Sequence, residues 1–226
     1  MRIRKVLFIT ALVAFVSHLS AVDFKCSFGE GKWNAADWLI MKSPRWDYVG
    51  LWIQQADHIA NKVPADAGAE EMLSRRAGET YTSMILKNKF SGSVAISSTM
   101  SFAHRMAPLI VITNEYGKDS DGRPEHREHF EIVLYDKGLN VWHHYFKDGK
   151  PHWRKSAFMD AEFKPDVKYT LSVKIQFKGK GAMMTVSAGG KSFGFFDESL
   201  PENFHVGITG CEGINRFYDF SVKNIN

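Results

Sequence analysis

The chain has 226 residues, which is enough for one sizeable hydrophobic core, and 44% of them are hydrophobic. Its 29 basic and 25 acidic residues give a net charge of +4, but three of the basic residues (Arg2, Arg4 and Lys5) lie within the first five positions. No stripe of Lys and Arg follows in the rest of the chain, so the composition argues against a nucleic-acid-binding protein.

The N-terminus has the pattern of an export signal. A basic start is followed by an apolar run over residues 6–16, by the polar pair Ser17 and His18, and by the small residue Ala21. This order predicts a signal peptide over residues 1–21 and a mature domain over residues 22–226. An uncleaved anchor is the alternative, although the apolar run is shorter than the about 20 residues that span a bilayer. No later segment approaches that length, so we expect a secreted or periplasmic protein that leaves the membrane after cleavage.

The chain contains two cysteines, Cys26 and Cys211, both in the expected mature domain. In an oxidising compartment two cysteines favour one disulfide. They lie near opposite ends of the domain, and in many β-sandwiches the first and last strands are neighbours, so we expect a bond between them. Two free, buried thiols are the alternative. With so few thiols and no CxxC motif, no metal site is expected.

The hydrophobic pattern has period two, which predicts strands rather than helices. In residues 93–102 the apolar side chains alternate with Ser, Ala and Thr, and a Gly189-Gly190 hairpin signal joins two later strands. The other predicted strands are residues 109–113, 169–177, 182–188, 191–196, 205–209 and 216–222. One short helix is expected within residues 66–76. The sequence therefore predicts a single all-β domain, a two-sheet antiparallel jelly-roll sandwich.

Four of the six tryptophans lie close together in the N-terminal part of the mature chain: Trp33, Trp38, Trp46 and Trp52. Because aromatic burial dominates the cores of sandwiches, we expect them to pack in or around the core rather than to form a ligand platform.

Residues 125–146 carry the densest set of chemically active side chains. Along residues 127–135, one face is apolar and the other carries Arg127, His129, Glu131 and Tyr135. Because alternate residues of a strand line one side of a sheet, the polar residues are predicted to line a groove. Surface decoration by salt bridges is the alternative.

The following strand is predicted to add a histidine to this face. If Lys137-Gly138 forms the tip of a two-residue hairpin, Glu131 pairs with His144, and Asn140 and Trp142 share the groove. A one-residue slip would bring His143 and Tyr145 to the groove instead. Either register places an imidazole near the Glu131 carboxylate, where the carboxylate can hold one tautomer or raise the pKa of the ring.

Three further segments contribute candidate residues. His104 and Arg105 lie at a predicted strand end, and Arg216 follows Glu212 near the C-terminal strand; local salt bridges explain these residues equally well. The loop over residues 114–123 contains Asp119, Asp121 and Gly122 but only partly resembles a calcium loop, which needs more oxygen ligands at fixed spacing. We expect a solvated turn there, with Ca²⁺ binding as the alternative and no other cofactor.

Several segments together resemble the concanavalin-A-like lectin/glucanase superfamily. They are FSGSVAISSTMSF (90–102), PLIVI (108–112), EHFEIVLYD (128–136), YTLSVKIQF (169–177) and HVGITGCEGINRFYDFSVKN (205–224). Within that superfamily the chain is most similar to bacterial galectin-like secreted domains of unknown function and, more distantly, to 3-keto-disaccharide hydrolase domains. The resemblance covers residues 24–226 and implies a carbohydrate partner and a role in binding or degrading a polysaccharide.

The resemblance does not identify one activity, because members include lectins, glycoside hydrolases and polysaccharide lyases. The chain lacks the closely spaced Glu-x-Asp-x-x-Glu run of laminarinase-type members, and Glu125 and Glu131 are too far apart on one strand for a retaining pair. Glu115 or Glu212 would have to supply a partner. A lyase-like or hydrolase-like enzyme, a non-catalytic sugar-binding module and a structural β-sandwich all remain open. The candidate catalytic residues are Arg127, His129, Glu131, Tyr135 and His144. The candidate substrate-binding residues are His104, Arg105, Asn140, Trp142, His143 and Arg216.

Overall fold

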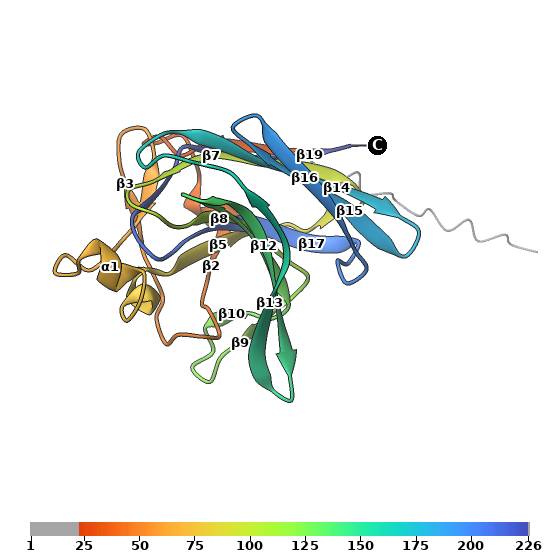
Figure 1. Cartoon of the computed structure of the whole chain (residues 1–226). Helices are drawn as coiled ribbons and strands as arrows, with labels where there is room; N and C mark the ends of the chain where they lie inside the picture. Colours follow the sequence, from red (N-terminus) through yellow and green to blue (C-terminus); the bar gives the residue numbers. More distant parts are fainter. Residues whose placement is uncertain (1–22, 226) are drawn as a thin grey trace, which may run out of the picture.

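The computed structural model describes residues 23–225, so the export signal predicted over residues 1–21 lies outside the described residues. Two large sheets lie face to face, which confirms the predicted all-β sandwich (Figure 1). Every pairing between named strands is antiparallel. No helix among the described residues is long and apolar enough to cross a membrane.

The first sheet has nine strands in the order β16-β15-β14-β7-β18-β4-β3, with β19 also pairing β7 and β1 pairing β19. Their bounds are β1 Phe24–Ser27, β3 Trp52–Gln54, β4 Ile59–Asn61, β7 Val94–Phe102, β14 Tyr169–Lys178, β15 Gly181–Ala188, β16 Lys191–Asp197, β18 Asn215–Phe217 and β19 Asp219–Asn224.

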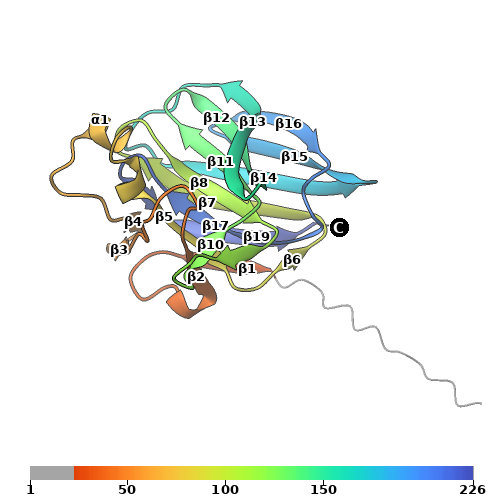
Figure 2. The ribbon, with the colours of Figure 1, turned by 90° about the horizontal axis from the view of Figure 1, so that it is seen from below.

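The second sheet has eight strands in the order β13-β12-β11-β8-β17-β5-β2, with β6 pairing one end of β17. Their bounds are β2 Trp38–Met41, β5 Thr82–Leu86, β6 Phe90–Ser91, β8 Pro108–Thr113, β11 His129–Tyr135, β12 Gly138–Lys147, β13 Lys150–Asp160 and β17 Asn203–Gly210. A separate hairpin of β9 (Tyr116–Lys118) and β10 (Pro124–His126) lies on the side of this sheet that faces away from the first (Figure 1). Figure 2 turns that side toward the viewer.

The main core fills the space between the sheets, and strand alternation explains which residues reach it. On β11, Phe130, Ile132 and Leu134 are buried in this core, as the sequence predicts. A second, smaller apolar cluster lies on the outer face of the second sheet and includes Leu109, Val111 and Val133. The outer face of this sheet is therefore partly covered rather than open to water.

Two predicted elements differ from the structure. The strand expected over residues 216–222 is divided into β18 and β19. Tyr218 lies between them and donates its backbone N–H to Thr99 O of β7, so the pairing with β7 is interrupted there. The helix expected over residues 66–76 is reduced to one turn, α1 (Ala69–Met72), followed by a 3-10 turn over Ala77–Thr80. Both short helices lie in a connection, where few apolar residues are available to stabilise a longer one.

The tryptophans follow the predicted packing with one exception. Trp38 is buried in the main core, with ring centroids 5.4 Å from Phe220 and 5.7 Å from Phe28. Trp33 and Trp52 pack against the edge of this core. Trp46 instead lies against the second cluster on the outer face.

The predicted disulfide is wrong, because Cys26 and Cys211 are both free. The first and last strands are indeed neighbours, and Cys26 on β1 pairs with Phe220 of β19. Cys211, however, follows β17 and lies in the cluster on the outer face of the second sheet, whereas Cys26 packs against the main core. Burial raises the pKa of both thiols, that of Cys26 to about 12, which lowers the fraction of reactive thiolate in the folded protein.

We expect both cysteines to react with a thiol reagent once the protein is unfolded without reductant. The folded protein should react slowly, because both thiols are shielded and protonated. Counting labelled thiols by mass spectrometry checks this, with a reduced sample as the control. Unfolded, unreduced protein that takes up no label would contradict it.

Candidate functional site

The β11–β12 hairpin turns one residue earlier than the sequence suggests. Tyr135 pairs with Gly138, so the loop is Asp136-Lys137 and the predicted register is shifted by two residues. Gly138 has φ +149°, and a Cβ there would lie 2.1 Å from Met159 O of β13. This glycine therefore permits the close approach of β13 rather than forming the turn tip. Because the shift is even, every side chain keeps its predicted face.

Three predicted residues meet on the outer face of the second sheet: His129, Glu131 and His144. His129 and His144 are direct partners across the two strands, and Glu131 lies two residues along β11 on the same face. The Nε2 atom of His144 is 3.0 Å from Glu131 Oε2, and the Nε2 atom of His129 is 3.6 Å from Glu131 Oε1. The structure thus places one histidine against each oxygen of this carboxylate.

The imidazole rings around this carboxylate are stacked. Ring centroids are 4.5 Å apart for His129 and His144 and 4.6 Å apart for His126 and His129. All three rings are at least nine-tenths buried. His126 was not among the predicted site residues, because it precedes β11 and belongs to β10. Its Nε2 lies 2.9 Å from the Ser83 hydroxyl of β5.

Burial and charge set the protonation of this cluster. Burial lowers the pKa of His126 and of His129, and Glu131 only partly offsets the effect on His129. Burial would raise the pKa of Glu131, but the neighbouring His144 and His129 outweigh it and hold that pKa well below its usual range. The site is thus an ionised carboxylate among buried imidazoles.

A pocket of about 220 Å³ opens beside this cluster on the outer face of the second sheet. Glu131 and His144 form part of its wall, whereas His129 does not line it. The remaining lining residues are Ser43, Arg45, Trp46, Tyr81, Met106, Ala107, Leu109, Val133, Trp142, Trp153, Cys211 and Glu212. The pocket therefore combines aromatic rings with a few charged groups, as ligand sites do.

Glu212 is the second carboxyl group of the pocket. It has a left-handed backbone with φ +57°, which is uncommon for a residue with a side chain, and its backbone N–H donates to Thr80 Oγ1 at 2.7 Å. Burial raises the pKa of Glu212, and the charge of Glu131 adds to this effect. In the sequence, Glu212 is only one of two possible partner carboxylates, because no strand pattern around residue 212 predicts where its side chain lies.

Residues 42–47, here called the strap, form one wall of the pocket. The strap follows β2 and runs beside β10, where Lys42 N donates to Pro124 O and His126 N donates to Lys42 O. Arg45 and Trp46 of the strap line the pocket, and the Arg45 guanidinium lies 4.3 Å from the Trp46 ring centroid and 4.5 Å from that of Trp153. Arg45 thereby links the strap to β13.

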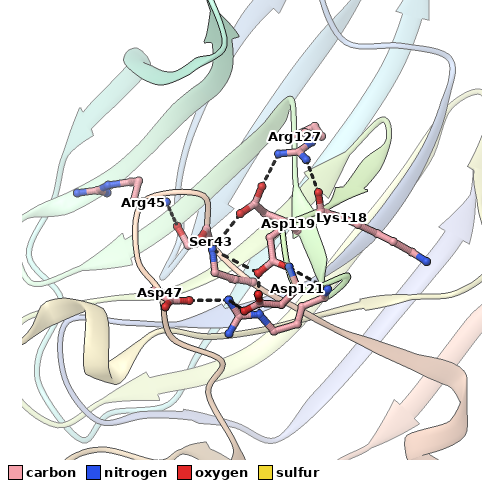
Figure 3. Close-up of polar contacts among 10 residues, drawn as sticks. Ser43, Arg45, Asp47, Lys118, Asp119, Asp121 and Arg127 are labelled. Carbon is pink, nitrogen blue, oxygen red and sulfur yellow. Dashed lines mark hydrogen bonds and ion pairs between the residues drawn. The ribbon is translucent and has the colours of Figure 1, made fainter.

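Ion pairs hold the strap against the β9–β10 hairpin (Figure 3). Lys42 Nζ is 2.9 Å from Glu125 Oε2, and both side chains are less than one-tenth exposed. Arg123 bonds both Asp47 of the strap, at 2.5 Å, and Asp119 of the hairpin, at 2.6 Å. The Asp119 carboxylate also accepts from the backbone of Asp121. In this loop, where a solvated turn was expected and Ca²⁺ binding was the alternative, the Asp119 carboxylate makes internal contacts and is only 7% exposed.

The other predicted residues of the hairpin lie apart from the pocket. The Arg127 side chain pairs with Glu125. It also donates to Lys118 O (Figure 3). Asn140 is buried on the outer face near Tyr135, and neither residue lines the pocket. His143, the residue expected in the groove after a one-residue slip, instead stacks on Phe130 and bonds Glu128 at 2.8 Å.

The remaining candidates form local ion pairs, which is the alternative that the sequence left open. His104 pairs with Glu70, Arg105 with Asp136, and Arg216 with Asp166. Of the predicted substrate-binding residues, only Trp142 lines the pocket. Sequence reasoning missed four residues that line the pocket: Arg45 and Trp46 from the strap, Tyr81 just before β5, and Trp153 from β13.

No protein-family model matches the chain, and no curated protein matches it in sequence. Solved structures do match. The chain is similar to a carbohydrate-binding module, CBM66, from Bacillus subtilis, with TM-score 0.56, 9% identity, and coverage of 83% of this chain and 96% of that one. It is also similar to the winged bean acidic lectin in complex with methyl-α-D-galactose, with TM-score 0.56, 7% identity, and coverage of 89% and 97%.

A third similar structure is described as a native glycosidic hydrolase, with TM-score 0.53, 10% identity, and coverage of 91% of this chain and 97% of that one. At these identities the likeness shows the fold alone. The chain has the concanavalin-A-like jelly-roll fold.

Proposed function

We propose that this protein is an exported, carbohydrate-active protein that binds a sugar in the outer-face pocket and cleaves it there. The observation that carries the proposal is the pocket itself, which brings aromatic rings and the partly buried carboxyl group of Glu212 together on the sheet face next to the His129-Glu131-His144 cluster. Export is supported by the basic and apolar pattern of residues 1–21.

The aromatic side chains are suited to hold a sugar ring. Trp142 and Trp153 come from adjacent strands, β12 and β13, and Trp46 comes from the strap opposite. Flat apolar rings beside polar groups match a pyranose, which has apolar C–H faces and a rim of hydroxyl groups. The volume of about 220 Å³ lies below the roughly 300–1,000 Å³ of sites for drug-sized ligands, which favours one or two sugar units.

Glu212 is the group proposed to transfer the proton. Its raised pKa keeps it protonated to higher pH than an ordinary glutamic acid, as a general acid requires. Its left-handed backbone is a conformation that residues with a side chain adopt mainly where the surrounding structure enforces it, and such positions cluster at functional sites. Glu212 would protonate the leaving oxygen in a hydrolase or in a lyase, so the product tells these two apart.

We expect Glu212→Gln to lower kcat by about 10²–10⁴-fold while leaving ligand binding nearly unchanged, because the amide cannot donate a carboxyl proton. The protein is first incubated with a glycan array to find its ligand. Turnover of that ligand is then measured both by new reducing ends and by ultraviolet absorbance, since only a lyase makes an unsaturated product. The matched control is Glu115→Gln, the same change at an exposed glutamate outside the pocket.

Equal loss of activity in both variants would contradict the role of Glu212. Binding without turnover in the native protein would make it a non-catalytic sugar-binding module. Failure to bind any glycan would contradict the carbohydrate function as a whole and favour a structural β-sandwich.

A further inference from the structure

The carboxylate of Glu131 lacks a full set of proton donors. His129 Nδ1 is 2.8 Å from the backbone oxygen of Arg127, and a carbonyl can only accept, so the ring proton of neutral His129 lies on Nδ1. The Nε2 atom that faces Glu131 Oε1 at 3.6 Å therefore presents a lone pair to an oxygen lone pair. Two electron-pair donors face each other across a gap in a buried site.

No other described basic side chain lies close to the gap between His129 Nε2 and Glu131 Oε1. Among the described residues, the basic groups within 4 Å of the Glu131 carboxylate are these two histidines. The Glu131 side chain is only 12% exposed, so water compensates little of its charge. The close partner of this shielded carboxylate is the His144 ring at 3.0 Å, and a bound cation would add a full counter-charge where the His129 ring turns a lone pair toward Oε1.

We propose that His129, Glu131 and His144 bind a divalent transition-metal ion. The candidate ligand atoms, one from each residue, all lie within 4.8 Å of one another. Two imidazoles and one carboxylate form a set that suits Zn²⁺ or Fe²⁺ and is poorly suited to Ca²⁺, which takes six to eight oxygen ligands. This inference departs from the sequence expectation of no metal site, which rested on cysteine patterns and not on imidazoles.

The sheet builds the site in three ways. Direct cross-strand pairing puts His129 beside His144, and the period of two puts Glu131 on the same face. The hydrogen bond from His129 Nδ1 to Arg127 O fixes Nε2 as the ligand atom, which is the usual arrangement around metal-binding histidines. The stacked ring of His126 holds the plane of His129.

Binding of the ion changes the bonding of His144. Its Nε2, now 3.0 Å from Glu131 Oε2, gives its lone pair to the ion, and the neutral ring keeps its proton on Nδ1. Glu131 and His144 line the pocket, so the remaining coordination positions open toward a bound ligand. A site with three protein ligands and open positions is the pattern of a metal ion that contacts substrate or water rather than a purely structural one.

The test is isothermal titration calorimetry, in which Zn²⁺ is added to the chelator-treated, full-length protein in the absence of any sugar. We expect one saturable site per chain. Glu131→Gln and His129→Gln should each weaken binding by more than the about 10–100-fold that the loss of an outer-shell partner costs. His143→Gln is the matched control, because it changes the neighbouring histidine on the opposite face of β12 and should leave Zn²⁺ affinity unchanged. Circular dichroism verifies that each variant is folded.

A native protein that binds no Zn²⁺, or one whose affinity is the same in Glu131→Gln, His129→Gln and the control, overturns the metal site. Equal, weak binding in all variants would mean an adventitious ion only. Since no sugar is present, the result does not depend on the proposed carbohydrate function. Zn²⁺ binding without glycan binding would refute the carbohydrate function and support the metal site. Glycan binding without Zn²⁺ binding would refute the metal site and leave the carbohydrate function in place.

Discussion

Replacing Lys42 by methionine should destabilise the protein by about 1.5–3 kcal/mol, the range for a hydrogen bond to a charged group. The loss stays below that of a wholly uncompensated buried charge, because Arg123 and Arg127 still pair the two carboxylates that Lys42 contacts. The Lys42 ammonium bonds Glu125 at 2.9 Å and lies 3.8 Å from Asp119, and all three side chains are less than one-tenth exposed. Lys42→Met keeps most of the apolar stem but leaves two shielded carboxylates without this cation. Chemical denaturation followed by tryptophan fluorescence measures the change in the free energy of unfolding.

The double variant Lys42→Met/Glu125→Leu separates charge from packing. Because it removes the carboxylate together with the ammonium, we expect it to recover much of the lost stability. Lys118→Met, at an exposed lysine of the same hairpin, should change stability by no more than about 0.5 kcal/mol. If Lys42→Met were as mild as Lys118→Met, the ion pair would not anchor the strap.

Gly207→Ala should prevent stable folding. Gly207 lies in the middle of β17, a central strand of the second sheet, and pairs with Ile85 of β5. A Cβ there would lie 2.0 Å from Met84 O and 2.7 Å from Ile85 Cα, and both are backbone atoms of the neighbouring strand. The strands would have to separate, so we expect the soluble yield to collapse and any recovered protein to melt at much lower temperature.

Gly68→Ala is the matched control, because a Cβ at Gly68 meets nothing within 4 Å. This variant should fold and melt like the native protein. If Gly207→Ala behaved in the same way, the close approach of β5 and β17 would have to be relaxed in solution.

Much of the fold follows from strand periodicity. The alternation along residues 93–102 and 169–177 predicts β7 and β14 almost to the residue, and the Gly189-Gly190 turn joins β15 to β16. The faces of β11 were also predictable, since burial of Phe130 and Ile132 leaves His129 and Glu131 on the other side. Local pattern is sufficient here because each strand buries one face against one core.

The rest of the site depends on contacts between distant segments, which periodicity does not encode. The predicted hairpin register was wrong because a glycine such as Gly138 usually indicates a turn. In the structure this glycine instead lets the backbone of β13 approach closely. The predicted disulfide was wrong because Cys211 does not lie on the last strand. It follows β17, so the pairing of the first and last strands does not bring it to Cys26. Arg45, Trp46 and Glu212 come to the pocket on irregular backbone, where sequence carries little directional information.

The way in which the strap is fastened has a consequence for protein engineering. The strap is anchored by side-chain ion pairs and by two backbone bonds to β10, outside the strand ladders of the two sheets. Its pocket-facing positions, Arg45 and Trp46, can therefore be exchanged between the fixed points at Lys42 and Asp47 without disturbing the register of any strand. Exchanges at these two positions would then reshape the pocket wall and leave the sandwich behind it intact.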